Sequence, residues 1–118
     1  MSADPSTDCP FCKIVSGDIP ADMVHTDEHA VAFRDLNPQA PVHVLVIPRR
    51  HEPDLASLVR ADAEAAAGLT RAIADVADAE DLGDGYRTVF NTGAQAHQSV
   101  FHCHAHVLGG RTMGWPPG

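Results

Sequence analysis

Basic side chains are scarce in this sequence. Its 118 residues include eight lysines and arginines against sixteen aspartates and glutamates, a formal net charge of −8. Proteins that bind polymeric nucleic acid neutralise backbone phosphates with lysine and arginine, so we expect no such partner. A single nucleotide is compatible with this charge, because backbone N–H groups and neutral histidines can hold a phosphate.

Long apolar runs are also missing. No stretch approaches the roughly 20 apolar residues that a membrane-spanning helix needs, and residues 1–8 are polar and acidic rather than signal-like. These features predict a cytoplasmic protein with no membrane partner. We expect residues 1–8 to form a disordered tail and residues 9–118 to form one domain, since a second core needs a longer chain.

Cysteine is equally sparse. Cys9 and Cys12 form a CxxC pair and Cys103 stands apart, so the sequence holds no even-numbered disulfide framework. A CxxC pair is typical of metal and redox sites. The redox type usually opens a helix that follows a strand, whereas only a polar tail precedes Cys9. This position favours metal binding and leaves redox chemistry as the alternative.

The remaining pattern predicts short strands and one long helix. Apolar residues recur at three- and four-residue steps over 54–81, which is typical of a helix packed on a core. A short helix is expected over 10–15, and strands over 23–26, 30–34, 43–47, 86–91 and 101–108. This mixture predicts an α+β domain in which a five-stranded antiparallel sheet carries the long helix on one face.

Three histidines occupy alternate positions in the segment His102-Cys103-His104-Ala105-His106-Val107-Leu108. In a strand, alternate residues share one face at a spacing of about 6 to 7 Å. Such a row can hold an oxyanion, transfer protons near neutral pH or bind a metal. The spacing alone leaves catalysis, metal binding and no chemical role open.

This segment resembles the signature of the histidine triad (HIT) family, in which histidines alternate with hydrophobic residues. The stretch 35–51, which begins Asp35-Leu36-Asn37-Pro38-Gln39 and ends Arg49-Arg50-His51, resembles the nucleoside-binding region of that family. Asn91-Thr92-Gly93, Gln98-Ser99-Val100 and Leu108-Gly109-Gly110-Arg111 resemble its Hint branch, with the CxxC pair of the bacterial zinc-containing type. The resemblance covers residues 9–118.

The resemblance implies a purine nucleoside phosphoramidase, which cleaves the P–N bond of AMP- or GMP-linked amines and acts on related aminoacyl-adenylates. His104 would attack the α-phosphorus and form a nucleotidyl-histidine that water then hydrolyses. His43 and His106 would bracket the phosphate. Ser99 would hydrogen-bond the phosphate or the leaving group.

The resemblance also implies a nucleotide site. Asp35 would bind the ribose hydroxyls beside Phe33 and Leu36, although a turn carboxylate and two core residues would explain the same pattern. Asn91 would contact the ribose-phosphate side. The full set of predicted nucleotide contacts is Phe33, Asp35, Leu36, Asn91, Gln98, Ser99, Val100, His104 and His106.

For the CxxC pair, the resemblance implies a structural zinc ion held by Cys9, Cys12, His51 and His102. A regular strand would place His102 on the same face as His104, so the zinc interpretation requires a bend or a strand start near His102. The resemblance further implies a homodimer in which the two sheets join and Trp115 approaches the partner's site.

Two alternative functions stay open. One is a dinucleoside polyphosphate hydrolase of the Fhit type, and the other is a nucleotide-binding regulatory module without significant turnover. The terminal Trp-Pro-Pro-Gly resembles Hint rather than Fhit, and the presence of His104 and Ser99 favours turnover. His97 departs from the Hint pattern, in which glycine is common, and this change bears on the choice of leaving group.

Overall fold

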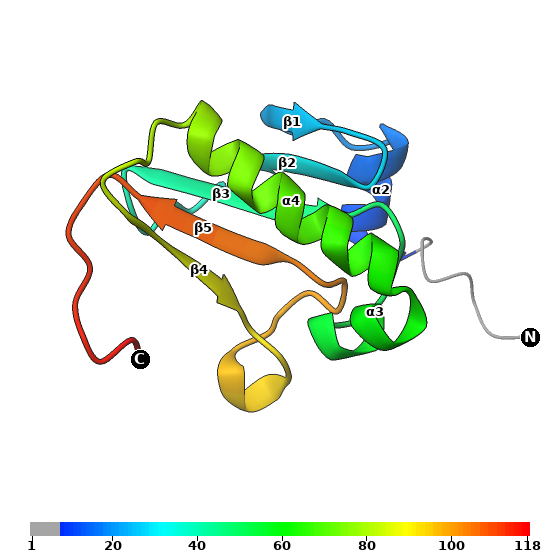
Figure 1. Cartoon of the computed structure of the whole chain (residues 1–118). Coiled ribbons are helices and arrows are strands. Elements are labelled where there is room, and N and C mark those ends of the chain that lie inside the picture. Colours follow the sequence, from blue (N-terminus) through cyan, green and yellow to red (C-terminus); the bar gives the residue numbers. More distant parts are fainter. Residues whose placement is uncertain (1–7) are drawn as a thin grey trace, which may run out of the picture.

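A five-stranded antiparallel sheet forms the centre of the protein (Figure 1). The structure is a computed structural model that describes residues 8–118, so the expected tail over 1–8 lies outside the described residues except for Asp8. The strands are β1 (Met23–Thr26), β2 (Ala30–Arg34), β3 (Val42–Pro48), β4 (Tyr86–Phe90) and β5 (Ala105–Gly109). Their spatial order is β1-β2-β3-β5-β4, with every neighbouring pair antiparallel. The predicted fold class is confirmed.

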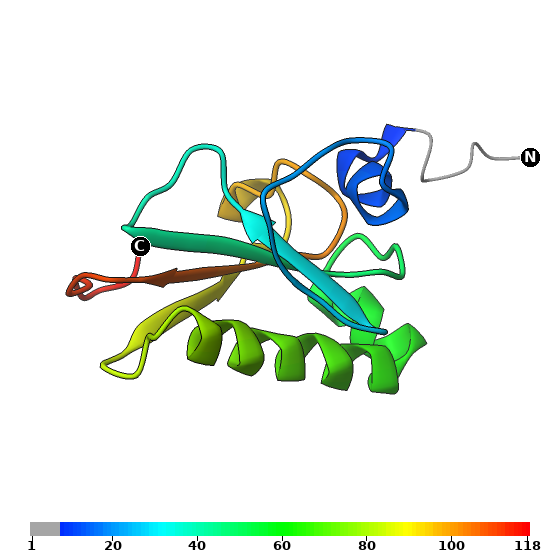
Figure 2. The same ribbon diagram turned by 90° about the horizontal axis from the view of Figure 1, so that it is seen from above.

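Both faces of the sheet are covered. Helix α4 (Ala63–Ala79) lies along one face, and the short helix α2 (Pro10–Ser16) lies on the other side (Figure 2). Because successive strand residues point to opposite faces, Val44 and Val46 pack into the cluster beneath α4, whereas Leu45 and Ile47 join the cluster beneath α2. This double burial explains the uninterrupted apolar run of β3.

Helix α2 begins and ends where the sequence predicts. Cys9 is its N-cap, and its sulfur accepts a hydrogen bond from the backbone N–H of Cys12, while Pro10 occupies the first helical position. Gly17 ends the helix in the left-handed region at φ 87°, where glycine carries no Cβ penalty. The cap therefore places both cysteines at the N-terminal end of the helix.

The long helix predicted within 54–81 is present as α4, but the chain breaks at Asp62, so the residues before it form a separate helix. Helix α3 (Leu55–Ala61) ends there and α4 begins one residue later. Asp62 is extended at φ −157°, and its side chain accepts a hydrogen bond from the N–H of Ala65. Both helices bury apolar residues in the same core, so the apolar periodicity continues across the break.

The last strand is also shorter than the predicted range 101–108, since β5 begins at Ala105. The N–H of Cys103 donates to the carbonyl oxygen of Glu52, outside the sheet ladder. Only one histidine of the triad, His106, thus lies within β5. Within residues 8–118, no helix combines the length and the apolar character needed to cross a bilayer.

Candidate active site and metal site

Two of the three triad histidines belong to separate side-chain clusters. His102 lies in a group with two cysteines, whereas His106 lies in a group with His43 and Asp35. His104 comes directly before β5, and its ring centroid is 5.1 Å from that of His106. The predicted row on one strand face is therefore wrong, and the strand start that the zinc interpretation required is present at Ala105.

The first cluster contains the four predicted zinc ligands, Cys9, Cys12, His51 and His102, whose ligand atoms all lie within 4.8 Å of one another. The Nδ1 atom of His102 is 3.3 Å from the sulfur of Cys9 and 3.4 Å from that of Cys12. The Nδ1 atom of His51 is 3.3 Å from the sulfur of Cys12 and 3.1 Å from Nδ1 of His102.

This donor set fits a tetrahedral zinc ion. Zinc bonds of about 2.3 Å to sulfur and 2.0 to 2.1 Å to nitrogen imply N···S edges of about 3.6 Å and N···N edges of about 3.3 Å. The observed separations are within a few tenths of an ångström of these values. Two thiols and two imidazoles are also the ligand types of a Cys2His2 site.

The hydrogen bonds of His102 prepare it as a metal ligand. Its Nε2–H donates to the carbonyl oxygen of Pro48 at 2.9 Å, so Nδ1 carries the lone pair that faces the cysteines. The side chain is fully buried, and this burial lowers its pKa to about 4. His102 is therefore neutral at pH 7, as metal ligation requires.

His104 has the geometry of a nucleophile. Its Nδ1 lies 2.8 Å from the carbonyl oxygen of His102, and because a carbonyl can only accept, Nδ1 carries the proton. In the neutral ring the lone pair is then on Nε2. The ring is nearly buried, with 7% of its surface exposed, and it packs against Phe11.

His43 and His106 form a directed pair beside it. The backbone N–H of Gln39 donates to Nδ1 of His43, so Nε2 of His43 carries the proton. That Nε2 donates to Nδ1 of His106 at 2.9 Å and lies 3.4 Å from a carboxylate oxygen of Asp35. In neutral His106 the proton is consequently on Nε2, which makes this nitrogen a hydrogen-bond donor.

Burial keeps this pair neutral. The pKa of His106 is lowered to about 4, mainly by desolvation, with smaller contributions from the neighbouring His104 and His43 and an opposing one from Asp35. Desolvation also lowers the pKa of His43, against the opposing effect of the Asp35 carboxylate. The site at pH 7 therefore offers uncharged imidazoles whose protons have fixed positions.

An apolar pocket of about 310 Å³ opens on the α2 side of the sheet. It contains all three predicted nucleoside contacts on this side, Phe33, Asp35 and Leu36. The Leu36 side chain is fully exposed at the pocket, while Phe33 is buried in its wall. Asp35 also accepts a hydrogen bond from the N–H of Asn37, so the turn role considered from the sequence is present as well.

The connection between β4 and β5 carries the other predicted contacts. Asn91 directly follows Phe90, the last residue of β4, which pairs with Ala105 at the start of β5. Ser99 is exposed, and Val100 packs against the apolar cluster of the pocket.

The Gln98 side chain is buried in this connection. It accepts a hydrogen bond from the N–H of Gly93 and donates to the carbonyl oxygens of Pro53 and Val100. Gln98 thereby fixes the loop that presents Ser99. A nucleotide contact by its side chain stays a prediction.

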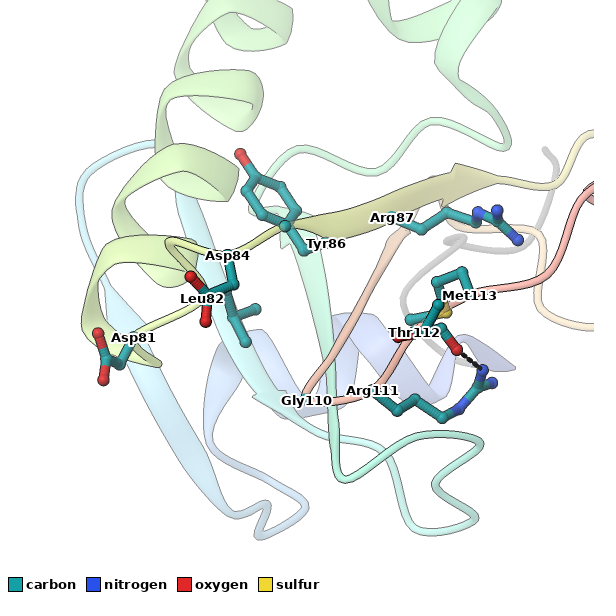
Figure 3. A pocket seen from close by; sticks show the side chains of 10 residues that line it. Asp81, Leu82, Asp84, Tyr86, Arg87, Gly110, Arg111, Thr112 and Met113 are labelled. Carbon is teal, nitrogen blue, oxygen red and sulfur yellow. Dashed lines mark hydrogen bonds between the residues drawn. The ribbon is translucent and has the colours of Figure 1, made fainter.

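A larger hollow of about 580 Å³ lies elsewhere, between the turn that follows α4 and the segment after β5 (Figure 3). None of the predicted site residues lines it. Arg111 donates to the carbonyl oxygens of Thr112 and Gln39, and Arg87 donates to that of Gly114. Both guanidinium groups thus hydrogen-bond to the C-terminal segment, where Trp115 is 82% exposed.

Several residues of the site are not evident from the sequence. Pro10, Phe11 and Ile14 of α2 line the apolar pocket, together with Leu45 of β3. The CxxC pair carries a signal for two of them only, because Pro10 and Phe11 lie between the two cysteines that cluster with His102. The role of the His102 carbonyl in orienting His104 has no sequence signal, since every residue has a carbonyl.

Comparison with known proteins finds a matching family model and several relatives of similar length. The model of the HIT domain family matches residues 16–113. The chain is 48% identical to an uncharacterized HIT-like protein of Synechococcus elongatus, over 96% of this chain and 99% of that protein. It is 47% identical to a 14 kDa zinc-binding protein of Zea mays, over 92% of this chain and 86% of that protein.

Among solved structures, a HIT family hydrolase from Legionella pneumophila superposes with a TM-score of 0.89 and 46% sequence identity. The match covers 94% of this chain and all of the other. Family model, sequence and fold agree over nearly the whole chain, and the protein belongs to the HIT domain family.

Proposed function

We propose that this protein is a hydrolase of purine nucleoside phosphoramidates, with His104 as the nucleophile. The observation that carries the proposal is the hydrogen bond from Nδ1 of His104 to the carbonyl of His102, which leaves the lone pair on Nε2. A neutral imidazole nitrogen attacks phosphorus near pH 7 without prior deprotonation. The neighbouring apolar pocket, which contains Asp35, is suited to a nucleoside.

The reaction consists of two displacements at the α-phosphorus. In the first, Nε2 of His104 bonds to phosphorus while the substrate P–N bond breaks, and the leaving nitrogen takes a proton from solvent and departs as the amine. In the second, water bonds to phosphorus while the bond to Nε2 of His104 breaks, a proton of that water passes to solvent, and AMP or GMP is released. The Nε2–H of His106 stabilises negative charge on the phosphoryl oxygens, with His43 holding the ring in the required tautomer.

The proposal assigns the substrate contacts as follows. Asp35 hydrogen-bonds the ribose hydroxyls, while the aromatic and aliphatic side chains of the pocket pack against the purine. Ser99 hydrogen-bonds the phosphate or the leaving group, and Asn91 contacts the ribose-phosphate side. A cytoplasmic location, without polymeric nucleic acid or membrane partners, belongs to the same proposal.

Zinc binding by Cys9, Cys12, His51 and His102 is part of the proposal, and its role is structural. It is supported by the ligand geometry and by the zinc-binding relative in Zea mays. Bound there, zinc would join α2 to the segment before β5 and supply no catalytic chemistry.

A homodimer is proposed on the basis of the sheet edge. In the order β1-β2-β3-β5-β4, strand β4 is an edge strand, and an unpaired strand edge can pair with a second copy. Trp115 is exposed beside Arg87 of that strand, with the guanidinium carbon 5.9 Å from the ring centroid. Light scattering tests this, because a dimer gives twice the 12.5 kDa mass of the chain.

The test of the proposed function is AMP release from an adenosine 5′-phosphoramidate. We expect turnover by the wild type and a loss of at least about 10³-fold in His104→Ala, since removing a nucleophile abolishes the covalent route. His25→Asn changes a histidine of β1 outside both clusters of the site and serves as the control. Equal turnover by wild type and His104→Ala would contradict the nucleophilic assignment.

The alternatives are decided in the same assay. A dinucleoside polyphosphate cleaved faster than the phosphoramidate would favour a hydrolase of the Fhit type. AMP binding without turnover of either substrate would favour a regulatory binding module. The intact set of His104, His106 and Ser99 supports turnover over binding alone.

A further inference from the structure

Helix α2 contributes to two sites at once. Its N-cap Cys9 and its residue Cys12 are half of the metal cluster, while Phe11 and Ile14 line the apolar pocket. The helix has only seven residues, and isolated helices shorter than about 12 residues are marginal in water. Its position therefore depends on what anchors it, and the metal cluster is the anchor at its N-terminal end.

Phe11 connects both sites to the nucleophile. Its ring lies edge-on to His104 at a centroid distance of 5.1 Å and an interplanar angle of 86°. The same ring lies 6.0 Å from His102, the metal-cluster histidine, and 5.6 Å from Phe33 of the pocket wall. With 8% of its surface exposed, the side chain is buried among these partners. A shift of α2 must therefore disturb the support of His104 and the pocket wall together.

We propose that metal binding and nucleotide binding are coupled through Phe11. When Cys9 and Cys12 bind metal, they fix α2 in the position in which Phe11 completes the pocket and supports the ring of His104. Without the metal, α2 loses this anchor and the pocket loses the wall that α2 provides. Phe11 is a positioning residue, because it acts through His104 and the pocket shape. The inference rests on the proposed nucleotide binding in this pocket.

Coupling between two binding sites is reciprocal. If metal binding favours the pocket shape that accepts a nucleotide, a bound nucleotide must raise the metal affinity by the same factor. Couplings between sites commonly amount to about 5- to 150-fold in affinity. Because one short helix belongs to both sites, we expect an effect on the order of 10-fold.

The experiment measures the zinc dissociation constant of the full chain by competition with a chromogenic chelator, with and without saturating AMP. We expect AMP to lower this constant about 10-fold. A control mixture of chelator, zinc and AMP without protein corrects for the zinc that AMP itself binds. Calorimetry measures AMP binding to the zinc-loaded and the metal-free protein, and we expect binding to weaken by the same factor after metal removal.

Two variants locate the coupling. Phe11→Leu keeps an apolar side chain but removes all three ring contacts, so AMP should no longer change its zinc affinity. Leu36→Ala is the matched control, because Leu36 lines the same pocket but is fully exposed. Leu36→Ala should need more AMP for saturation. At saturation, AMP should lower its zinc dissociation constant as much as it does for the wild type. If Phe11→Leu fails to fold, Phe11→Met takes its place.

The outcomes separate this inference from the proposed function. AMP that binds the wild type without changing its zinc affinity would overturn the coupling and leave the proposed function standing. Absence of binding of both AMP and GMP would overturn both. Coupling of equal size in the wild type and in Phe11→Leu would show that Phe11 does not carry it.

Discussion

The Nε2 atom of His43 lies 2.9 Å from Nδ1 of His106, in a pair of one buried and one partly buried histidine that the antiparallel β3 and β5 bring together. Burial lowers the pKa of His106 from 6.5 to about 4. The unfolded chain therefore takes up a proton at a higher pH than the folded protein does. This difference makes the free energy of unfolding fall as the pH drops from about 6.5 towards 4.

We expect this loss to approach about 1.4 kcal/mol per pH unit for the one group within that window. Urea unfolding of the wild type and of His106→Asn at several pH values measures it, and the variant should show the shallower decline. Both proteins keep the same metal ligands, so acid release of a metal contributes equally to the two. Identical declines would contradict a lowered pKa at His106.

Gly68 provides a packing prediction. A Cβ on this residue of α4 would overlap Cγ of His29, so the glycine allows the helix to approach the hairpin of β1 and β2. Overpacking of this kind costs about 1 to 3 kcal/mol, which exceeds the gain of about 1 kcal/mol in helix propensity from glycine to alanine. We expect Gly68→Ala to lower the free energy of unfolding.

The control for this prediction is Gly83→Ala. No atom lies within 4 Å of the corresponding Cβ position at Gly83, so this variant should be near neutral. Chemical unfolding at one pH compares the two. A Gly68→Ala protein at least as stable as the wild type would show that His29 moves aside without cost.

Metal content gives a third prediction. Purified wild type should contain close to one zinc per chain, and Cys9→Ser should lose it, because a serine hydroxyl is a poor replacement for a thiolate ligand. Cys103→Ala is the matched control, since Cys103 is buried in the core beneath α4 and is not part of the ligand cluster. Elemental analysis measures the zinc content per chain of the wild type and both variants. A wild type that contains no metal would contradict the zinc site.

The periodicity of apolar residues in the sequence predicted those elements in which the apolar positions are the ones that the fold buries. The strand β3 is such a case, because Val44 and Leu45 are both apolar and both faces of the strand are buried. The break at Asp62 was missed for the same reason, since Leu58 and Leu69 on either side of it enter one core and continue the helical pattern. An aspartate within an apolar pattern is an N-cap signal that periodicity does not detect.

The site was predictable to the extent that the sequence resembles the histidine triad family. Residue type and spacing marked the CxxC pair and the triad histidines as candidates for metal binding or catalysis, and the resemblance then assigned His104 and the four metal ligands their roles. The partners of Phe11 could not be selected, because an apolar residue has the same pattern in a core and in a pocket. The start of β5 at Ala105, which directs His102 to the cysteines, depends on long-range contacts that no local pattern contains.

His97 gives the last prediction, because it adopts the left-handed region at φ 62° and ψ 34° without being glycine. A residue with a Cβ is strained there by about 1 kcal/mol or more, and glycine is not. Glycine also makes the unfolded chain more flexible, which offsets part of the gain. We therefore expect His97→Gly to raise the free energy of unfolding by up to about 1 kcal/mol.

His97→Ala separates backbone strain from the loss of the imidazole, since it removes the ring and keeps the Cβ. It should be about as stable as the wild type, whereas His97→Val should be less stable because a branched Cβ is poorly tolerated at positive φ. Urea unfolding measures the free energy of unfolding of the wild type and of the three variants and so ranks their stabilities. If His97→Gly and His97→Ala were equally stable, the strain at this left-handed position would be no larger than the entropic cost of glycine in the unfolded chain, which would contradict the expected gain.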